Sequence, residues 1–130
     1  MSEIYAVPDV SVTVLLAEDS DAIRSAIKRI LKDQPGIALV GEAVNFSQTL
    51  QMTAELKPQV VLLDLHMPGE QEFSPAFVKS QLLLSAKHVL VISIWNDNEA
   101  RALATSYGAA TLLDKINLGS QLVPAILRLA

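Results

Sequence analysis

Five polar residues follow directly on short apolar segments of the chain, and together they offer groups that can do chemistry. Glu18 and Asp19 end the first segment, Asp64 ends the third, Ser93 ends the fourth, and Lys115 follows the fifth. Carboxylates that share a pocket repel one another, and without a cation at least one of them tends to protonate. Mg²⁺ relieves this repulsion, since it prefers oxygen ligands in octahedral geometry. The residue types therefore predict a magnesium site, provided that the fold brings them together.

The same residues suit the transfer of a phosphoryl group to a carboxylate. A carboxylate is a weak nucleophile, but it attacks phosphorus when a metal ion and an ammonium group absorb the phosphoryl charge. Asp64 is the candidate nucleophile, and Lys115 supplies the ammonium group. The hydroxyl of Ser93 can donate a hydrogen bond to a phosphoryl oxygen.

An alternation of apolar and amphipathic stretches predicts the elements that position these residues. Short runs rich in Val, Ile and Leu are predicted as strands at residues 12–17, 38–40, 60–63, 89–92 and 111–113. Such nearly continuous apolar runs are typical of strands buried on both faces of a parallel sheet. In such a sheet, ligands bind at the carboxyl ends of the strands near the switch point in strand order. The polar residues are therefore expected to converge at that edge.

The clearest helix is predicted after Ser20, which is its N-cap. Its apolar stripe comprises Ile23, Ala26, Ile27, Ile30 and Leu31. Arg24, like the other basic residues of this stretch, lies off the stripe. The pair Pro35-Gly36 is expected to end the helix.

The remaining helices are predicted between Asn45 and Pro58, from Ser74 onward, at residues 98–107 and at residues 118–129. The second helix is expected to bury Phe46, Leu50 and Ala54. Pro124 is expected to kink the fifth helix or to delay its start. Five strands that alternate with five helices predict an α/β fold, in which helices cover both faces of a parallel sheet.

Composition places the chain among small globular domains. Its 130 residues suit one domain, and 51% are apolar while 18% are charged, so a packed core is expected. The absence of cysteine excludes disulfides and thiolate sites, and it fits a cytoplasmic location. The net charge of −4 argues against non-specific binding of nucleic acid. No apolar run approaches the ~18 residues of a membrane span. Residues 1–11 are expected to form an N-terminal extension to a domain of residues 12–130.

The polar residues occur in an order that resembles a known family. The resemblance is carried by the acidic pair Glu18-Asp19, the run Asp64-Leu65-His66-Met67-Pro68-Gly69, the hydroxyl of Ser93, and Lys115. In these features the chain resembles the receiver domain of bacterial two-component response regulators, the CheY-like family, over about residues 12–129. The resemblance implies a flavodoxin-like fold with strand order 2-1-3-4-5. The resemblance weakly favours the subfamily whose effector is a helix-turn-helix DNA-binding domain.

The resemblance also implies a role for each residue. Asp64 would take a phosphoryl group from a phosphohistidine of a sensor histidine kinase. The implied Mg²⁺ ligands are Asp19, Asp64 and the backbone carbonyl of His66, with Glu18 acting largely through water. Lys115 would pair with the phosphoryl group, and Ser93 would bond it and move in its presence. The chain would then be a phosphorylatable regulatory domain, and not an enzyme, although it would assist its own phosphorylation and dephosphorylation.

Three positions depart from the family pattern. Many receivers carry Tyr or Phe three residues before the lysine, as a ring that swings inward on activation, but Leu112 occupies this switch position. Ile94 follows Ser93 where a small residue is common, and Ile116 follows Lys115 where proline is common. Leu112 has no polar end to expose in only one state, so it is expected to stay buried. The signal is then expected to travel through the loop after Ser93 and the fourth helix.

The implied partners are a sensor histidine kinase and a second copy of the chain, the latter through a face built from the fourth helix, fifth strand and fifth helix. Contact with DNA is expected only through an effector domain absent from this chain, and no contact with a membrane is expected.

Three other functions stay open. A degenerate receiver would act only as a protein-binding module. A hydrolase with an aspartyl nucleophile would normally carry a second acid at the position of His66. A flavin module would place its phosphate beside the acidic pair Glu18-Asp19, which would repel it.

Overall fold

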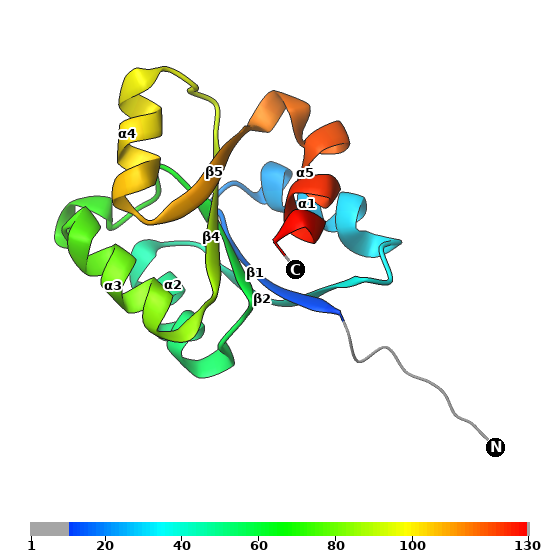
Figure 1. Cartoon of the computed structure of the whole chain (residues 1–130), viewed down its shortest axis with the longest axis horizontal. Helices are drawn as coiled ribbons and strands as arrows, with labels where there is room; N and C mark the ends of the chain where they lie inside the picture. The colour runs from blue at the N-terminus through cyan, green and yellow to red at the C-terminus, as the bar shows by residue number, and fades with distance from the viewer. Residues whose placement is uncertain (1–10, 130) are drawn as a thin grey trace.

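The computed structural model of the chain describes residues 11–129 (Figure 1). Its strands are β1 (Val12–Ala17), β2 (Ile37–Ala43), β3 (Val60–Asp64), β4 (His88–Ser93) and β5 (Ala109–Asp114). Its helices are α1 (Asp21–Lys32), α2 (Phe46–Leu56), α3 (Pro75–Ser85), α4 (Asn98–Ser106) and α5 (Leu118–Arg128), with short 3-10 turns η1 (Glu70–Glu72) and η2 (Lys115–Asn117). The N-terminal extension predicted at residues 1–11 lies outside the described residues, apart from Ser11.

The strands form one parallel sheet in the order β2-β1-β3-β4-β5, which confirms the predicted flavodoxin-like topology. α1 and α5 cover one face of the sheet, and α2, α3 and α4 cover the other (Figure 1). From β1 the chain first moves outward to β2 and then returns to the other side of β1 as β3. The carboxyl ends of β1 and β3 therefore flank the switch point, where ligands bind in sheets of this kind.

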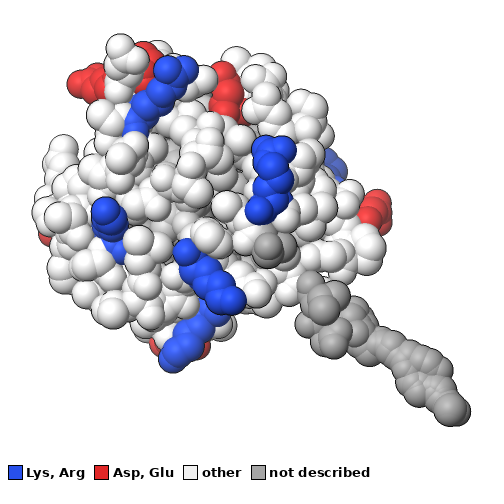
Figure 2. All heavy atoms as spheres, viewed as in Figure 1, with Lys and Arg blue, Asp and Glu red and all other residues white. Residues whose placement is uncertain are grey.

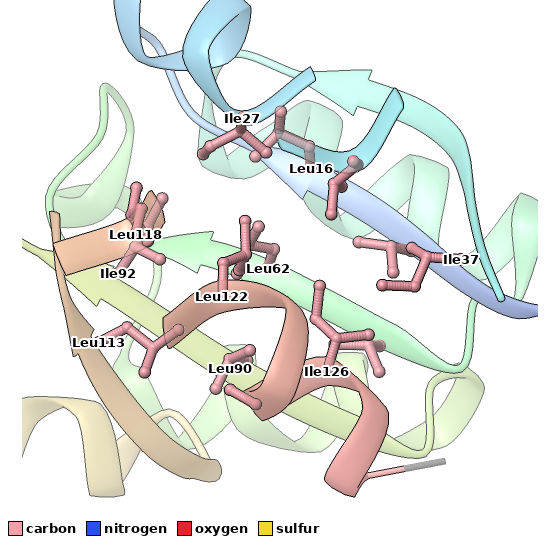
Figure 3. Close-up of a cluster of buried hydrophobic side chains, with 14 of the residues drawn as sticks. Leu16, Ile27, Ile37, Leu62, Leu90, Ile92, Leu113, Leu118, Leu122 and Ile126 are labelled. Atoms are coloured by element: carbon pink, nitrogen blue, oxygen red, sulfur yellow. The ribbon is translucent and has the colours of Figure 1, made fainter. Parts of the chain in front are cut away.

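Each face of the sheet has its own hydrophobic core. On the side of α1 and α5, Leu62 of the central strand packs in one cluster with Ile27 and Leu122 of the helices (Figure 3). On the other side, the rings of Phe46 and Tyr107 lie with their centroids 5.6 Å apart. All residues of β3 are buried, because the strand is covered on both faces. This explains why β3 has a continuous apolar run in the sequence.

Helix α1 begins as predicted. The Ser20 hydroxyl accepts a hydrogen bond from the N–H of Ile23 at 3.2 Å, as an N-cap does. The helix ends at Lys32, before the pair Pro35-Gly36 that was expected to end it. The earlier end follows from the proline, since the residue before a proline avoids the helical conformation and the chain must leave the helix in advance.

The predicted inner face of α2 is partly wrong. Ala54 is exposed, whereas Thr49 and Thr53 are fully buried. The Thr49 hydroxyl donates to the carbonyl of Asn45 at 2.7 Å, and the Thr53 hydroxyl donates to the carbonyl of Thr49 at 2.6 Å. Because each hydroxyl finds a partner on its own helix, both threonines are buried without an unpaired polar group.

The edge strands β2 and β5 are longer than predicted. The sequence indicated only residues 38–40 and 111–113, because an edge strand meets solvent and mixes buried with exposed side chains. In α5, Pro124 lies inside the helix on an exposed position. The helix already begins at Leu118, so the proline does not delay its start.

Charged side chains are dispersed on the surface. Figure 2 shows one face of the molecule, on which the Lys and Arg side chains are scattered and do not gather in one large basic patch. This face therefore lacks the concentrated positive charge that phosphate backbones require. Within the part of the chain that the structure describes, the helices are too short or too polar to cross a membrane.

Candidate functional site

The loop after β1 carries the first two acids of the site. Glu18 is fully buried, and its Oε2 accepts a hydrogen bond from the N–H of Ser20 at 3.0 Å. The N–H of Glu18 donates to the carbonyl of Ala43 at 2.9 Å, which anchors the loop to β2. The neighbouring Asp19 is exposed. The pair thus combines a fixed, buried carboxylate with one that faces solvent.

Asp64 is the last residue of β3 and lies beside the switch point of the sheet. Only 4% of its surface is exposed. Its Oδ1 lies 3.4 Å from the backbone N of His66, which is a long hydrogen bond. The backbone of the loop after β3 therefore stabilises the Asp64 carboxylate only weakly.

Lys115 joins the buried acids at the carboxyl end of the sheet. Its Nζ lies 2.8 Å from Oε1 of Glu18 and 3.1 Å from Oδ1 of Asp64. The lysine side chain is only 12% exposed. Apart from this ammonium group, Glu18 Oε1 has no hydrogen-bond partner among the residues that the structure describes. The ammonium group of Lys115 thus pairs with two buried carboxylates.

Carboxylate oxygens of Glu18, Asp19 and Asp64 all lie within 4.8 Å of one another, a grouping that can hold a metal ion. Burial raises the pKa of Asp64 to about 7, and the charge of Glu18 adds to this rise while Lys115 opposes it. Burial by itself lowers the pKa of Lys115, but its hydrogen bonds and charge interactions with the two buried acids outweigh burial and raise it. The protein groups alone therefore leave the site short of positive charge.

Ser93 ends β4 and is 2% exposed. Its Oγ accepts a hydrogen bond from the N–H of Trp95 at 2.9 Å, so the hydroxyl hydrogen can be donated elsewhere. A pocket of about 220 Å³ is lined by Ser93, Lys115 and the three acids, with Ile94 and Trp95 beside them. Ile94 and Trp95 are 60% and 56% exposed, so they stand at the rim and leave the pocket open.

Two predicted positions take no part in the carboxylate cluster through their side chains. His66 is exposed, and its Nδ1 lies 3.1 Å from Oε2 of Glu70. Leu112 is only partly buried, against the core on the side of α4, whereas full burial was expected. It borders a second pocket of about 220 Å³ between α4 and β5, which Arg101 and Ala104 also line.

Arg24 is the residue near the site that the helix pattern missed. It lies off the apolar stripe of α1, yet its side chain is only 16% exposed. Its Nη1 donates to the backbone carbonyl of Glu18 at 2.8 Å. The guanidinium group also contacts Asp21, and its Nε lies 3.5 Å from Oε1 of Glu42. The only signal in the sequence was an arginine placed shortly after an acidic pair at a predicted strand end.

Comparison with known proteins identifies the class of this domain. The model of the response regulator receiver domain matches residues 14–127. The chain therefore belongs to the response regulator receiver family, as the order of its polar residues predicted.

Relatives and solved structures agree with this assignment. The nitrate/nitrite response regulator protein NarL of Escherichia coli (strain K12) is 33% identical over 97 residues, which make up 75% of this chain and 44% of NarL. The transcriptional regulatory protein LiaR of Bacillus subtilis (strain 168) is 28% identical over 115 residues, or 88% of this chain and 54% of LiaR. The signal receiver domain of NarL from Mycobacterium tuberculosis superposes with a TM-score of 0.79 at 28% identity, covering 91% of this chain and 94% of that domain. The chain spans about half the length of these curated relatives.

Proposed function

We propose that this domain is the phosphoacceptor of a two-component system, and that Asp64 takes a phosphoryl group from the phosphohistidine of a sensor histidine kinase. The observation that carries the proposal is the ammonium group of Lys115, which lies 3.1 Å from Asp64 Oδ1 in a pocket that Ser93 also lines. A phosphoryl group on Asp64 would be within reach of both donors. The ammonium group is one of the two cations that transfer to a carboxylate needs, and a metal ion is the other.

The donor set of the site fits Mg²⁺. Three carboxylates oppose one ammonium group, and Glu18 Oε1 has no other partner among the described residues. Burial, together with the charge of Glu18, raises the pKa of Asp64, and a bound cation would oppose this rise. We assign Asp19, Asp64 and the backbone carbonyl of His66 as direct ligands, with Glu18 acting through water. When bound, the ion would neutralise charge on the carboxylates and on the phosphoryl oxygens.

The transfer itself is a displacement at phosphorus. An ionised carboxylate oxygen of Asp64 attacks phosphorus while the P–N bond to the donor imidazole breaks, and the imidazole nitrogen keeps the electron pair. Lys115 shifts its hydrogen bond from the carboxylate to a phosphoryl oxygen, and Ser93 donates its free hydroxyl hydrogen to another. The product is an acyl phosphate, which water hydrolyses to the carboxylate and inorganic phosphate. The domain is thus a switch that is set by a kinase and reset by hydrolysis.

The relatives suggest how a signal would leave this domain. NarL is named as a response regulator and LiaR as a transcriptional regulatory protein, and this chain matches only part of each. We infer that residues 12–130 form the receiver domain of a regulator whose DNA contacts belong to a separate effector domain. Self-association through α4, β5 and α5 is the proposed means by which phosphorylation reaches that effector.

Labelling with acetyl phosphate tests the proposal. In the presence of Mg²⁺, the intact mass should rise by one phosphoryl group, and chelation of the metal should prevent this. Asp64→Asn should stay unlabelled, whereas Asp33→Asn, which alters an exposed acid beyond the end of α1, should label like the wild type. Equal labelling of Asp64→Asn would refute the assignment. A folded wild type that is never labelled would instead favour a degenerate receiver that serves only as a protein-binding module.

A further inference from the structure

We propose that Arg24 is a positioning residue for the metal site. Its guanidinium group fixes the backbone carbonyl of Glu18, and through this peptide it holds the carboxylate of Asp19 where it can ligate a divalent cation. The inference rests on the metal site proposed above and adds a residue that does not touch the metal itself.

The guanidinium group of Arg24 contacts acceptors from three parts of the chain. Nη1 donates to the Glu18 carbonyl at 2.8 Å, Nη2 contacts Asp21 Oδ1, and Nε lies 3.5 Å from Glu42 Oε1. The planar guanidinium group offers donors in fixed directions, so one arginine can bind three acceptors at once. Arg24 therefore connects the acidic loop, the first turn of α1 and strand β2.

The carbonyl that Arg24 binds belongs to the peptide unit between Glu18 and Asp19. Rotation of this unit would change the direction in which the Asp19 side chain leaves the backbone. Asp19 is exposed, and within residues 11–129 no hydrogen bond or ion pair holds its carboxylate. The backbone that Arg24 fixes therefore sets the direction from which the Asp19 side chain reaches within 4.8 Å of the other two acids.

The other anchors of the loop do not depend on Arg24. The N–H of Ser20 still donates to Glu18 Oε2 at 3.0 Å, and the N–H of Glu18 still donates to the Ala43 carbonyl at 2.9 Å. Loss of the guanidinium group should therefore loosen the carbonyl without unfolding the loop. The main effect is expected on metal affinity and only secondarily on stability.

Mg²⁺ titration of Arg24→Gln by calorimetry tests the inference. Groups that orient metal ligands typically contribute 10–100-fold to affinity, so we expect Mg²⁺ to bind at least about 10-fold more weakly. Lys28→Gln is the matched control, because Lys28 Nζ pairs with the same Glu42, at 3.3 Å, but does not reach the Glu18 carbonyl. Its affinity for Mg²⁺ should stay within about twofold of wild type.

A metal-free measurement separates positioning from general destabilisation. In Arg24→Gln, the amide of Ser20 should keep its wild-type exchange rate, because its hydrogen bond to Glu18 Oε2 does not depend on Arg24, and the free energy of unfolding should stay close to that of Lys28→Gln. Should Arg24→Gln fail to fold, Arg24→Lys can be used instead. It keeps the positive charge but loses the planar set of donors, so it too should bind Mg²⁺ more weakly. A folded variant at position 24 with wild-type Mg²⁺ affinity overturns the inference and leaves the metal site intact. A wild type that binds no Mg²⁺ overturns the proposed function itself.

Discussion

Lys115 Nζ lies 2.8 Å from Glu18 Oε1, so a residue that follows the last strand is paired with one that follows the first. The side chain passes the carboxyl ends of β3 and β4, which separate β1 from β5 in the sheet. On the way its ammonium group also reaches Asp64 Oδ1 at 3.1 Å. The same ammonium group that pairs with both buried acids in the resting site is thus in place for an incoming phosphoryl group.

Lys115→Met should destabilise the metal-free domain. The substitution leaves Glu18 and Asp64 buried without their shared cation, and breaking a buried ion pair costs about 3–5 kcal/mol. Lys87→Met, at an exposed lysine, should change the free energy of unfolding by less than about 0.5 kcal/mol. Denaturant unfolding in chelator measures both. We also expect added Mg²⁺ to restore part of the loss in Lys115→Met, because it supplies the missing positive charge. Equal stability of the two variants would show that Lys115 does not neutralise these acids.

The stability of the metal-free domain should depend on the ionisation of Asp64. Its folded pKa of about 7 lies above the usual 3.8, so the folded state favours the protonated acid. This contribution is fully present below pH 3.8 and is lost as the pH rises to about 7, because the unfolded chain ionises first. Asp64→Asn removes the effect and should gain more stability at pH 8 than at pH 5, by about 1–3 kcal/mol. The same gain at both values of pH would contradict the shift.

Beryllofluoride, which mimics a phosphoryl group, should alter the loop after β4. If Ser93 turns toward the bound group, the amide of Trp95 loses the acceptor that it now has at 2.9 Å. We expect altered amide exchange in residues 93–103 and little change in residues 23–31. A ligand shifts such an equilibrium only through its different affinity for the two states. Asp64→Asn removes the carboxylate that beryllofluoride would bind, so amide exchange in this variant should not change. Unchanged exchange in a domain shown to bind beryllofluoride would mean that the signal does not pass through α4.

Gly108 sets the end of α4, the helix through which we expect the signal to pass. Its φ is +84°, and an added Cβ would lie 2.9 Å from Lys79 Cγ and 3.1 Å from Leu83 Cδ1. Gly108→Ala should therefore destabilise the domain by about 1–2 kcal/mol. Gly119→Ala is the control, because a Cβ there meets nothing within 4 Å and alanine favours the helix by up to ~1 kcal/mol. Thermal unfolding should move in opposite directions for the two variants, and a shared direction would contradict the strain at Gly108.

The candidate site could be predicted because its residues end strands that are easy to recognise. β1, β3 and β4 lie inside the sheet and are covered on both faces, so their apolar runs are nearly continuous and stop at Glu18, Asp64 and Ser93. The edge strands lack this signal, and their limits were predicted too short. Burial of Thr53 was missed because its hydroxyl is satisfied on its own helix, which an apolar pattern does not reveal.

Arg24 could not be found from helix periodicity for a different reason. The pattern of α1 places the residue off the apolar stripe, and this remains true in the structure. Its contact with the Glu18 carbonyl depends on how α1 is set against the loop after β1, which is a tertiary relationship. Periodicity therefore predicted which face of α1 meets the core, but not which polar side chain turns back to the site.

Identification of the phosphorylated residue tests the role of Asp64 most directly. Protein labelled with acetyl phosphate and Mg²⁺ can be reduced with borohydride, which converts an aspartyl phosphate to homoserine, and the peptides can then be sequenced by mass spectrometry. We expect homoserine at position 64 and an unmodified side chain at Asp19, although Asp19 is the more exposed of the two acids. Homoserine at position 19 with Asp64 intact would contradict the assignment of Asp64 as the phosphoacceptor.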